Sequence, residues 1–130
     1  MRRVILIVDD DSAVLRSYGH LFRRLGCLVV LAEDSERVLA DPDSLRGVDL
    51  LILDQRMPKT SGLDLLAGLR RREAGAATPA VILISAFLSE ENRERAASLG
   101  VVEVIEKPVD AAHLLASVRV ALESRPPRRP

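Results

Sequence analysis

Five short apolar runs spread along the chain constrain its fold more than any other feature of the sequence. They occupy residues 4–8, 27–31, 49–53, 80–84 and 101–105 and are rich in valine, isoleucine and leucine. Near-continuous runs of this length are typical of strands that are buried on both faces of a parallel sheet. The sequence therefore predicts five strands inside the protein, covered on two sides by other parts of the chain.

Segments with the apolar spacing of helices alternate with these runs. The predicted helices span residues 12–25, 35–40, 63–72, 90–99 and 111–123. Ser12 is the predicted N-cap of the first helix, and Gly26 is predicted to end it. The fourth helix has little apolar surface, so we expect it to be the least firmly docked. Five strand–helix units predict an α/β fold, an open doubly wound five-stranded parallel sheet with five helices on its two faces.

Length and charge narrow the class of protein. A chain of 130 residues suits one domain with a single core. Its 19 acidic and 19 basic residues balance, so we expect direct contact neither with nucleic acid nor with a membrane. No apolar run is long enough to span a bilayer. The single cysteine, Cys27, lies in an apolar stretch and is predicted to be a buried, reduced thiol, which fits a cytoplasmic protein.

We predict that the domain covers residues 1–123. Residues 124–130 are rich in proline and arginine, and this composition predicts a disordered tail or a truncated linker. A docking peptide for an acidic or proline-binding partner is the alternative interpretation of the same residues. The run Arg70–Arg72 is interpreted as a solvated helix end, and His20 and His113 as surface or interface positions.

Polar residues follow four of the apolar runs, where the predicted strands end. Asp9 and Asp10 follow the first run, Asp54 the third, Ser85 the fourth, and Lys107 comes just after the fifth. Ligands bind outside the carboxyl ends of the strands in open parallel sheets, so these side chains are predicted to converge on one pocket. The chain has 17 arginines and only two lysines. This bias favours a role for Lys107 that needs a compact ammonium group.

Three carboxylates at one strand edge repel one another unless a cation lies between them. A few hard oxygen ligands with room for water suit Mg²⁺. Beside a metal ion and an ammonium group, Asp54 is predicted to be a nucleophile that takes a phosphoryl group and forms an acyl phosphate. A simpler interpretation, in which acidic residues after strands only cap loops and helices, accounts for Asp11 but not for the whole set.

At these residues the chain resembles the receiver domain of bacterial two-component response regulators. The matching pieces, in chain order, are Ile5–Asp11, Leu53–Pro58 with Gly62, Ile84–Ala86 and Lys107–Pro108. They lie within about residues 3–123, and their order and spacing together are highly specific. The resemblance implies the flavodoxin-like strand order 2-1-3-4-5, for which a member of this family is a known example. It also implies a regulatory domain rather than an enzyme.

The resemblance implies a role for each residue of the pocket. Asp54 would be the phosphoacceptor, supplied by the phosphohistidine of a sensor histidine kinase or by a phosphotransfer protein. Asp10, Asp54 and the backbone carbonyl of Arg56 would bind Mg²⁺ directly, and Asp9 would bind it through a water molecule. Lys107 would contact a phosphoryl oxygen.

The implied switch centres on Ser85, whose hydroxyl would move to donate a hydrogen bond to the phosphoryl group. Receiver domains usually carry an aromatic residue where Val104 stands, so the usual aromatic toggle is absent. Phe87 is predicted to hinder the attack of water and to lengthen the lifetime of the acyl phosphate. The Lys107–Pro108 peptide bond would be cis. The output would be a downstream protein target or a homodimer, bound through the face formed by the fourth helix, the fifth strand and the fifth helix.

Two other classes of function remain open at this point. An aspartate-nucleophile phosphatase also uses strand-end carboxylates and Mg²⁺, and Asp9 and Asp11 have the spacing of its paired carboxylates. The missing cap insertion leaves such an enzyme no substrate pocket. The third class is a constitutive interaction domain that has lost phosphotransfer, and the complete set of charged pocket residues argues against it.

Overall fold

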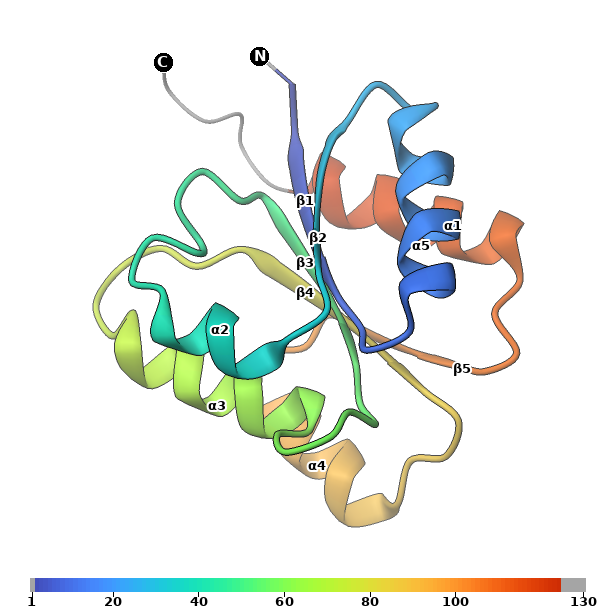
Figure 1. The fold of residues 1–130 in the computed structure, drawn as a ribbon. Helices are drawn as coiled ribbons and strands as arrows, with labels where there is room; N and C mark the ends of the chain where they lie inside the picture. Colours follow the sequence, from blue (N-terminus) through green and yellow to red (C-terminus); the bar gives the residue numbers. More distant parts are fainter. Residues whose placement is uncertain (1, 125–130) are drawn as a thin grey trace.

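The computed structural model describes residues 2–124 and contains one parallel sheet of five strands (Figure 1). The strands are β1 (Val4–Val8), β2 (Leu28–Ala32), β3 (Leu50–Asp54), β4 (Ala80–Ser85) and β5 (Glu103–Glu106). The helices are α1 (Ser12–Arg23), α2 (Ser35–Ala40), α3 (Gly62–Arg72), α4 (Glu90–Ser98) and α5 (Ala111–Glu123). The strand order is β2-β1-β3-β4-β5. The predicted α/β class and the order implied by the resemblance are both confirmed.

Helices cover the sheet on both faces. α1 and α5 lie on one face, and α2, α3 and α4 lie on the other (Figure 1). Successive side chains of a strand point to opposite faces, so Ile5 and Ile7 of β1 pack against α1 and α5, while Leu6 and Val8 pack on the other side. This two-sided packing is the reason that the strand sequences are apolar at nearly every position.

The central strands are fully buried, but the edge strand β2 is not. Every residue of β3 and β4 is buried. In β2, Leu28 is 46% exposed and Val30 is 50% exposed. β2 pairs only with β1, and the neighbouring helix α2 has only six residues. The prediction of five strands buried on both faces is therefore wrong for β2. It is also wrong for β5 at the opposite edge, where only Ile105 is buried, because an apolar run does not reveal an edge position.

The first helix begins one residue away from its predicted cap. Asp11 is the N-cap of α1, and its side chain accepts hydrogen bonds from the backbone N–H groups of Ala13 at 2.9 Å and Val14 at 3.3 Å. Ser12, the predicted N-cap, is the first helical residue. Aspartate and serine are about equally good N-caps, so their adjacent positions left the sequence ambiguous. Strand boundaries also shift slightly, and β5 begins at Glu103 rather than at residue 101.

α4 is docked mainly through polar contacts, as its sequence predicts. Ala96 is its one buried residue, whereas α3 buries six. Two ion pairs attach α4 to its neighbours: Arg93 lies 2.8 Å from Glu106 of β5, and Arg95 lies 2.7 Å from Asp64 of α3. Partly exposed ion pairs contribute little to stability. α4 can therefore shift at a smaller energetic cost than α3.

The arginine run at the end of α3 is not a solvated helix end, so that interpretation is wrong. The Arg72 side chain donates hydrogen bonds to three carbonyl oxygens at the end of α2, those of Val38, Leu39 and Asp41, at 3.1, 3.0 and 2.8 Å. Arg70 donates to the Leu99 carbonyl at the end of α4 and also to the Thr78 hydroxyl. Only Arg71 is exposed. Two of the three arginines thus satisfy carbonyl groups that helix ends leave unpaired.

The cysteine, the two histidines and the start of the predicted tail have the following positions in the structure. Cys27 is buried and forms no disulfide. His20 and His113 are exposed, and His113 lies 2.8 Å from Glu103. None of the described helices is long and apolar enough to cross a membrane. Of the predicted tail, Ser124 is the C-cap of α5, and residues 125–130 lie outside the described part of the chain.

Candidate functional site

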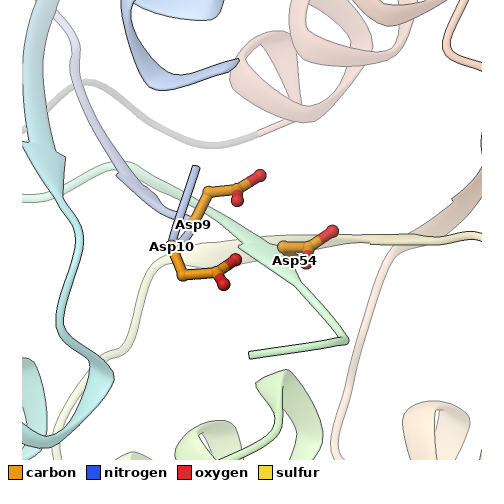
Figure 2. A group of neighbouring side chains, drawn as sticks. All are labelled: Asp9, Asp10 and Asp54. Carbon is orange, nitrogen blue, oxygen red and sulfur yellow. The ribbon is translucent and has the colours of Figure 1, made fainter. Parts of the chain in front are cut away.

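Three carboxylates meet where two adjacent strands end. Asp9 and Asp10 follow β1, and Asp54 is the last residue of β3, which pairs with β1. One carboxylate oxygen from each residue lies within 4.8 Å of the other two. Figure 2 shows the three side chains extending to the same side of the strand ends. The predicted convergence of these residues is therefore found, with Asp9 and Asp54 buried and Asp10 exposed.

Ser85 and Lys107 lie at the same carboxyl end of the sheet as the three carboxylates. Ser85 is the last residue of β4, and its carbonyl accepts a hydrogen bond from the backbone N–H of Lys107 at 2.9 Å. The Nζ atom of Lys107 lies 2.8 Å from Oδ1 of Asp54. The Lys107–Pro108 peptide bond is cis, as the resemblance implies. All five polar residues predicted from the strand ends thus lie at the carboxyl end of the sheet.

Gly62 and Gln55 hold the backbone that carries Asp54. The N–H of Gly62 donates to the Gln55 carbonyl at 3.0 Å, and the N–H of Leu63 donates to Oε1 of Gln55 at 2.9 Å. A Cβ atom on Gly62 would lie 2.5 Å from the backbone oxygen of Asp54. Glycine is therefore required here by the close approach of α3 to β3. Gln55 was not predicted as a site residue, because its role depends on how the following loop folds.

Asp9 is held in place by the turn into α1. Its Oδ1 atom accepts a hydrogen bond from the N–H of Asp11 at 2.9 Å. Burial raises the pKa of Asp9 from 3.8 to about 6, the Asp11 hydrogen bond opposes that rise, and the nearby charge of Asp54 adds to it. A carboxylate whose charged form is disfavoured in this way gains from a nearby cation.

Lys107 is the cation that balances Asp54. Burial alone would lower the pKa of Lys107, but its hydrogen bond to Asp54 and the charges of Asp54 and Asp9 outweigh that effect and raise it. Lys107 therefore stays charged at neutral pH. Oδ1 of Asp54 is buried and, apart from this ion pair, accepts no hydrogen bond from the described residues. The three carboxylates, one of which has an under-coordinated oxygen, offer the oxygen donors that Mg²⁺ binds.

The hydroxyl of Ser85 is already in a hydrogen bond. Its Oγ atom donates to the carbonyl oxygen of Phe87 at 2.7 Å, within the loop between β4 and α4. The Phe87 side chain is 79% exposed. Val104, in β5, is half-buried and packs on the face that α4 covers. Arg56 is exposed in the loop after β3, and the role of its carbonyl stays a prediction.

Tyr18 lies near the site, although its helical spacing indicates only a position on the apolar face of the first helix. Tyr18 of α1 is half-buried and packs against the cluster on its face of the sheet. Burial raises the pKa of its phenol, and the charges of Asp9 and Asp54 add to that rise while Lys107 opposes it. The phenol is therefore within electrostatic reach of the acidic cluster. An aromatic residue at helical spacing gives no sequence signal for this position.

Comparison with known proteins assigns the family. The sequence model of the response regulator receiver domain matches residues 5–119. The chain belongs to this family. Receiver domains are regulatory phosphoacceptor domains that work with histidine kinases in two-component signalling. The acidic cluster of Asp9, Asp10 and Asp54 is typical of the magnesium site in these domains.

Individual relatives and solved structures agree with this assignment. The transcriptional regulatory protein CpxR of Klebsiella pneumoniae is 38% identical over 118 residues, which cover 91% of this chain and 48% of the relative. The response regulator protein TodT of Pseudomonas putida is 36% identical, over 97% of this chain and 54% of the relative. The receiver domain therefore spans about half the length of these curated relatives.

The fold is shared with crystal structures of receiver domains. A CheY-like receiver domain from Methanospirillum hungatei superposes with a TM-score of 0.84 at 27% identity, over 95% of this chain and 96% of that one. A response regulator receiver protein from Pseudomonas putida superposes with a TM-score of 0.82 at 29% identity, over 92% and 98%. These matches extend over nearly the whole chain.

Proposed function

We propose that this receiver domain accepts a phosphoryl group on Asp54 from a sensor histidine kinase or a phosphotransfer protein. The reaction depends on Mg²⁺, takes place in the cytoplasm and changes the protein-binding surface of the domain. One observation carries the proposal: the buried carboxylate of Asp54 lies 2.8 Å from the Lys107 ammonium and within 4.8 Å of two further carboxylates. A nucleophile, a cation and a set of metal ligands are therefore combined in one site.

The transfer uses an ammonium group that already lies beside Asp54. A carboxylate oxygen of Asp54 attacks the phosphorus of the phosphohistidine, and the O–P bond forms as the P–N bond breaks. The imidazole leaves with the electron pair of that bond and takes up a proton. The Lys107 ammonium, which pairs with Asp54 before the reaction, then pairs with an oxygen of the transferred group. Stabilisation of that charge by a group already in place is the main catalytic contribution of the site.

Asp10, Asp54 and the Arg56 carbonyl are the proposed direct ligands of Mg²⁺, and Asp9 acts through a water molecule. When bound, the ion neutralises negative charge on the phosphoryl oxygens. The raised pKa of Asp9 and the under-coordinated oxygen of Asp54 support this assignment, because both groups gain from a nearby cation.

Ser85 is the proposed link between the site and the output surface. To donate to the phosphoryl group, its hydroxyl must leave the carbonyl of Phe87. The loop before α4 then loses a hydrogen bond, and the weakly docked α4 moves relative to β5. The face formed by α4, β5 and α5 is the proposed binding surface for a target or a second copy. The ion pair between Arg93 and Glu106 and the hydrogen bond between His113 and Glu103 lie on this face.

The proposal is tested by incubation with a small-molecule phosphodonor, with and without Mg²⁺, followed by intact-mass measurement. We expect one phosphoryl group per chain in the presence of Mg²⁺, and none in Asp54→Asn or when the metal is chelated. Oligomeric state is measured on the same samples. No uptake by the wild type, or equal uptake by Asp54→Asn, would overturn the proposal.

Two controls distinguish the other classes of function. Repeated turnover of a small phosphomonoester would favour the phosphatase, whereas a single stoichiometric modification favours a receiver. Unchanged partner binding and signalling in Asp54→Asn would favour a constitutive interaction domain. The family assignment and the position of Lys107 beside Asp54 both favour the receiver.

A further inference from the structure

The two edges of the sheet differ in how they are protected. β5, at one edge, begins and ends with glutamates; Glu106 is ion-paired to Arg93 of α4, and Glu103 lies within hydrogen-bond distance of His113 of α5. β2, at the other edge, has the sequence Leu-Val-Val-Leu-Ala, with no charge and no proline. Edge strands normally carry charges, prolines or bulges that prevent pairing with another chain. β2 carries none of these features.

The backbone of β2 presents a matched set of hydrogen-bonding groups to solvent. The N–H of Leu28 donates to the carbonyl of Arg3, and the carbonyl of Ala32 accepts from the N–H of Asp9. Successive residues of a strand turn their N–H and C=O groups to opposite sides, so Leu28, Val30 and Ala32 bond towards β1. Val29 and Leu31 therefore turn theirs outward. Within the described residues, these outward groups form no hydrogen bond.

We propose that the outer edge of β2 pairs with the same strand of a second copy, antiparallel, around a twofold axis at Val30. In this register Val29 lies opposite Leu31 of the other copy, and each of these two pairs forms two backbone hydrogen bonds. Val30 then faces its own equivalent at a position without hydrogen bonds, where side chains approach most closely. The register therefore uses all the outward backbone groups of Val29 and Leu31.

The exposed side chains of β2 are also compatible with antiparallel pairing of two β2 strands. Leu28 and Val30 are exposed on the α2 side of the sheet, and pairing places Leu28 opposite Ala32 of the other copy. Grooves of about 770 and 730 Å³ lie against β2. They leave room for an approaching strand. A strand pair of this length buries less area than a typical stable interface, so we expect a weak dimer that depends on concentration.

Charge favours the antiparallel direction. Arg23 lines the groove at the start of β2, and Glu33 lines the groove at its end. The twofold axis places the start of one strand beside the end of the other, so Arg23 faces Glu33 of the second copy in both halves of the interface. Arg16, Asp34, Arg37 and Asp41 also line the groove at the end of β2. Asp34 lies 3.8 Å from Arg37 of its own chain, and the side chain of Asp41 accepts a hydrogen bond from the N–H of Asp43. Glu33 is therefore the proposed partner for Arg23.

Sedimentation equilibrium without phosphodonor or Mg²⁺ tests the proposal. We expect the mass to rise from 14.2 kDa towards twice that value as the concentration increases. Val30→Lys places two ammonium groups opposite each other and should weaken association at least about tenfold. Val102→Lys, at an exposed valine in the bend before β5, is the matched control and should associate like the wild type. Circular dichroism checks that both variants fold.

A charge exchange tests the direction of pairing. Arg23→Glu and Glu33→Arg should each weaken the dimer, and the double variant should restore it, because the two charges are exchanged on both sides. Amide hydrogen exchange gives a second readout that needs no variant. The N–H groups of Val29 and Leu31 should become protected as concentration rises, whereas those of Leu28 and Val30 are already bonded to β1.

Three results would overturn the proposal. The isolated chain could stay monomeric at every concentration, which would also be the outcome if this edge receives a strand of a different protein. The dimer could resist Val30→Lys, or the outward amides could exchange equally fast at all concentrations. None of these results bears on phosphorylation, because the measurements use no phosphodonor and the same dimer is expected in Asp54→Asn.

Discussion

The ammonium of Lys107 lies 2.8 Å from Oδ1 of Asp54, although Asp54 ends β3, Lys107 follows β5, and β4 lies between these two strands. The contact is possible because the chain after β5 turns back across the end of β4, where the N–H of Lys107 donates to the Ser85 carbonyl. The side chain of Asp54 is 4% exposed and that of Lys107 is 36% exposed. A nearly buried carboxylate thus depends on a cation that solvent can still reach.

Lys107→Met should remove the charge that balances Asp54. Because Lys107 is partly exposed, we expect a loss of only about 1 kcal/mol in the free energy of unfolding without Mg²⁺. Phosphoryl uptake should slow by on the order of a hundredfold, since the transferring group loses its ammonium partner. Lys107→Arg keeps the charge and should restore stability but not the full rate. Uptake at the wild-type rate in Lys107→Met would contradict the role assigned to this residue.

Asp9 should make the metal-free fold less stable at neutral than at acidic pH. Its pKa is about 6 in the folded protein and 3.8 as the ordinary value, so the folded state binds more protons between these values. The contribution of Asp9 to stability therefore falls as pH rises from about 4 to 6, by up to about 3 kcal/mol.

Asp9→Asn isolates this effect, because asparagine keeps an acceptor for the Asp11 N–H and cannot ionise. The stability of Asp9→Asn relative to the wild type, measured by urea unfolding with a chelator present, should rise over this pH range. A difference that is independent of pH would show that the carboxylate ionises as easily in the fold as in the unfolded chain.

Phe87→Glu should speed the loss of phosphate from Asp54. The apolar ring of Phe87 follows Ser85 by two residues and is predicted to hinder the water molecule that attacks the acyl phosphate. A carboxylate at this position can instead orient that water molecule. We expect decay on the order of tenfold faster, with Phe87→Ala between the variant and the wild type. Because the side chain is 79% exposed, neither change should affect folding. The decay is followed by intact mass after the phosphodonor is removed, and equal rates in all three proteins would refute the prediction.

Gly62→Ala should disturb the site through the backbone of Asp54. The new Cβ would lie 2.5 Å from the Asp54 backbone oxygen, which a strand residue cannot avoid by rotation of a side chain. We expect a loss of about 2 kcal/mol in unfolding free energy, together with slower phosphoryl uptake. Gly19→Ala is the control, since its Cβ meets only flexible side chains at 3.3 Å and alanine favours the helix. Equal stability of the two variants would contradict this account of Gly62.

Arg72→Ala should destabilise the fold by about 2 kcal/mol, because it leaves the carbonyls at the end of α2 without their charged donor. Arg71→Ala removes the adjacent exposed arginine and should change stability by less than about 0.5 kcal/mol. Urea unfolding of both variants measures the difference. Similar losses in the two proteins would indicate a general effect of charge at the helix end.

Apolar periodicity predicted the alternation of strands and helices, and the family resemblance implied the strand order. The convergence of Asp9, Asp54 and Ser85 could be predicted because each stands at the end of an apolar run, and parallel strands bring such ends together. The exposed position of Val30 was not predicted, because an edge strand and a central strand of a sheet can have the same apolar sequence. The contacts of Arg72 were missed because they join residues more than 30 positions apart.

The remaining site features depend on loop geometry. The hydrogen bond from Ser85 to the Phe87 carbonyl and the contact between Gly62 and Asp54 arise only once the loops have folded. Neither apolar spacing nor composition specifies such contacts. The family resemblance implied the roles of Ser85 and Lys107, and it gave no indication of the β2 edge.

Locating the modified residue tests the central claim most directly. The wild type is incubated with a phosphodonor and Mg²⁺, the acyl phosphate is reduced with borohydride to homoserine, and the modified peptide is sequenced by mass spectrometry. The account predicts a single modified position, Asp54, and no modification after chelation of the metal. Modification of Asp9 instead, as the phosphatase interpretation requires, or uptake that does not need Mg²⁺, would contradict it.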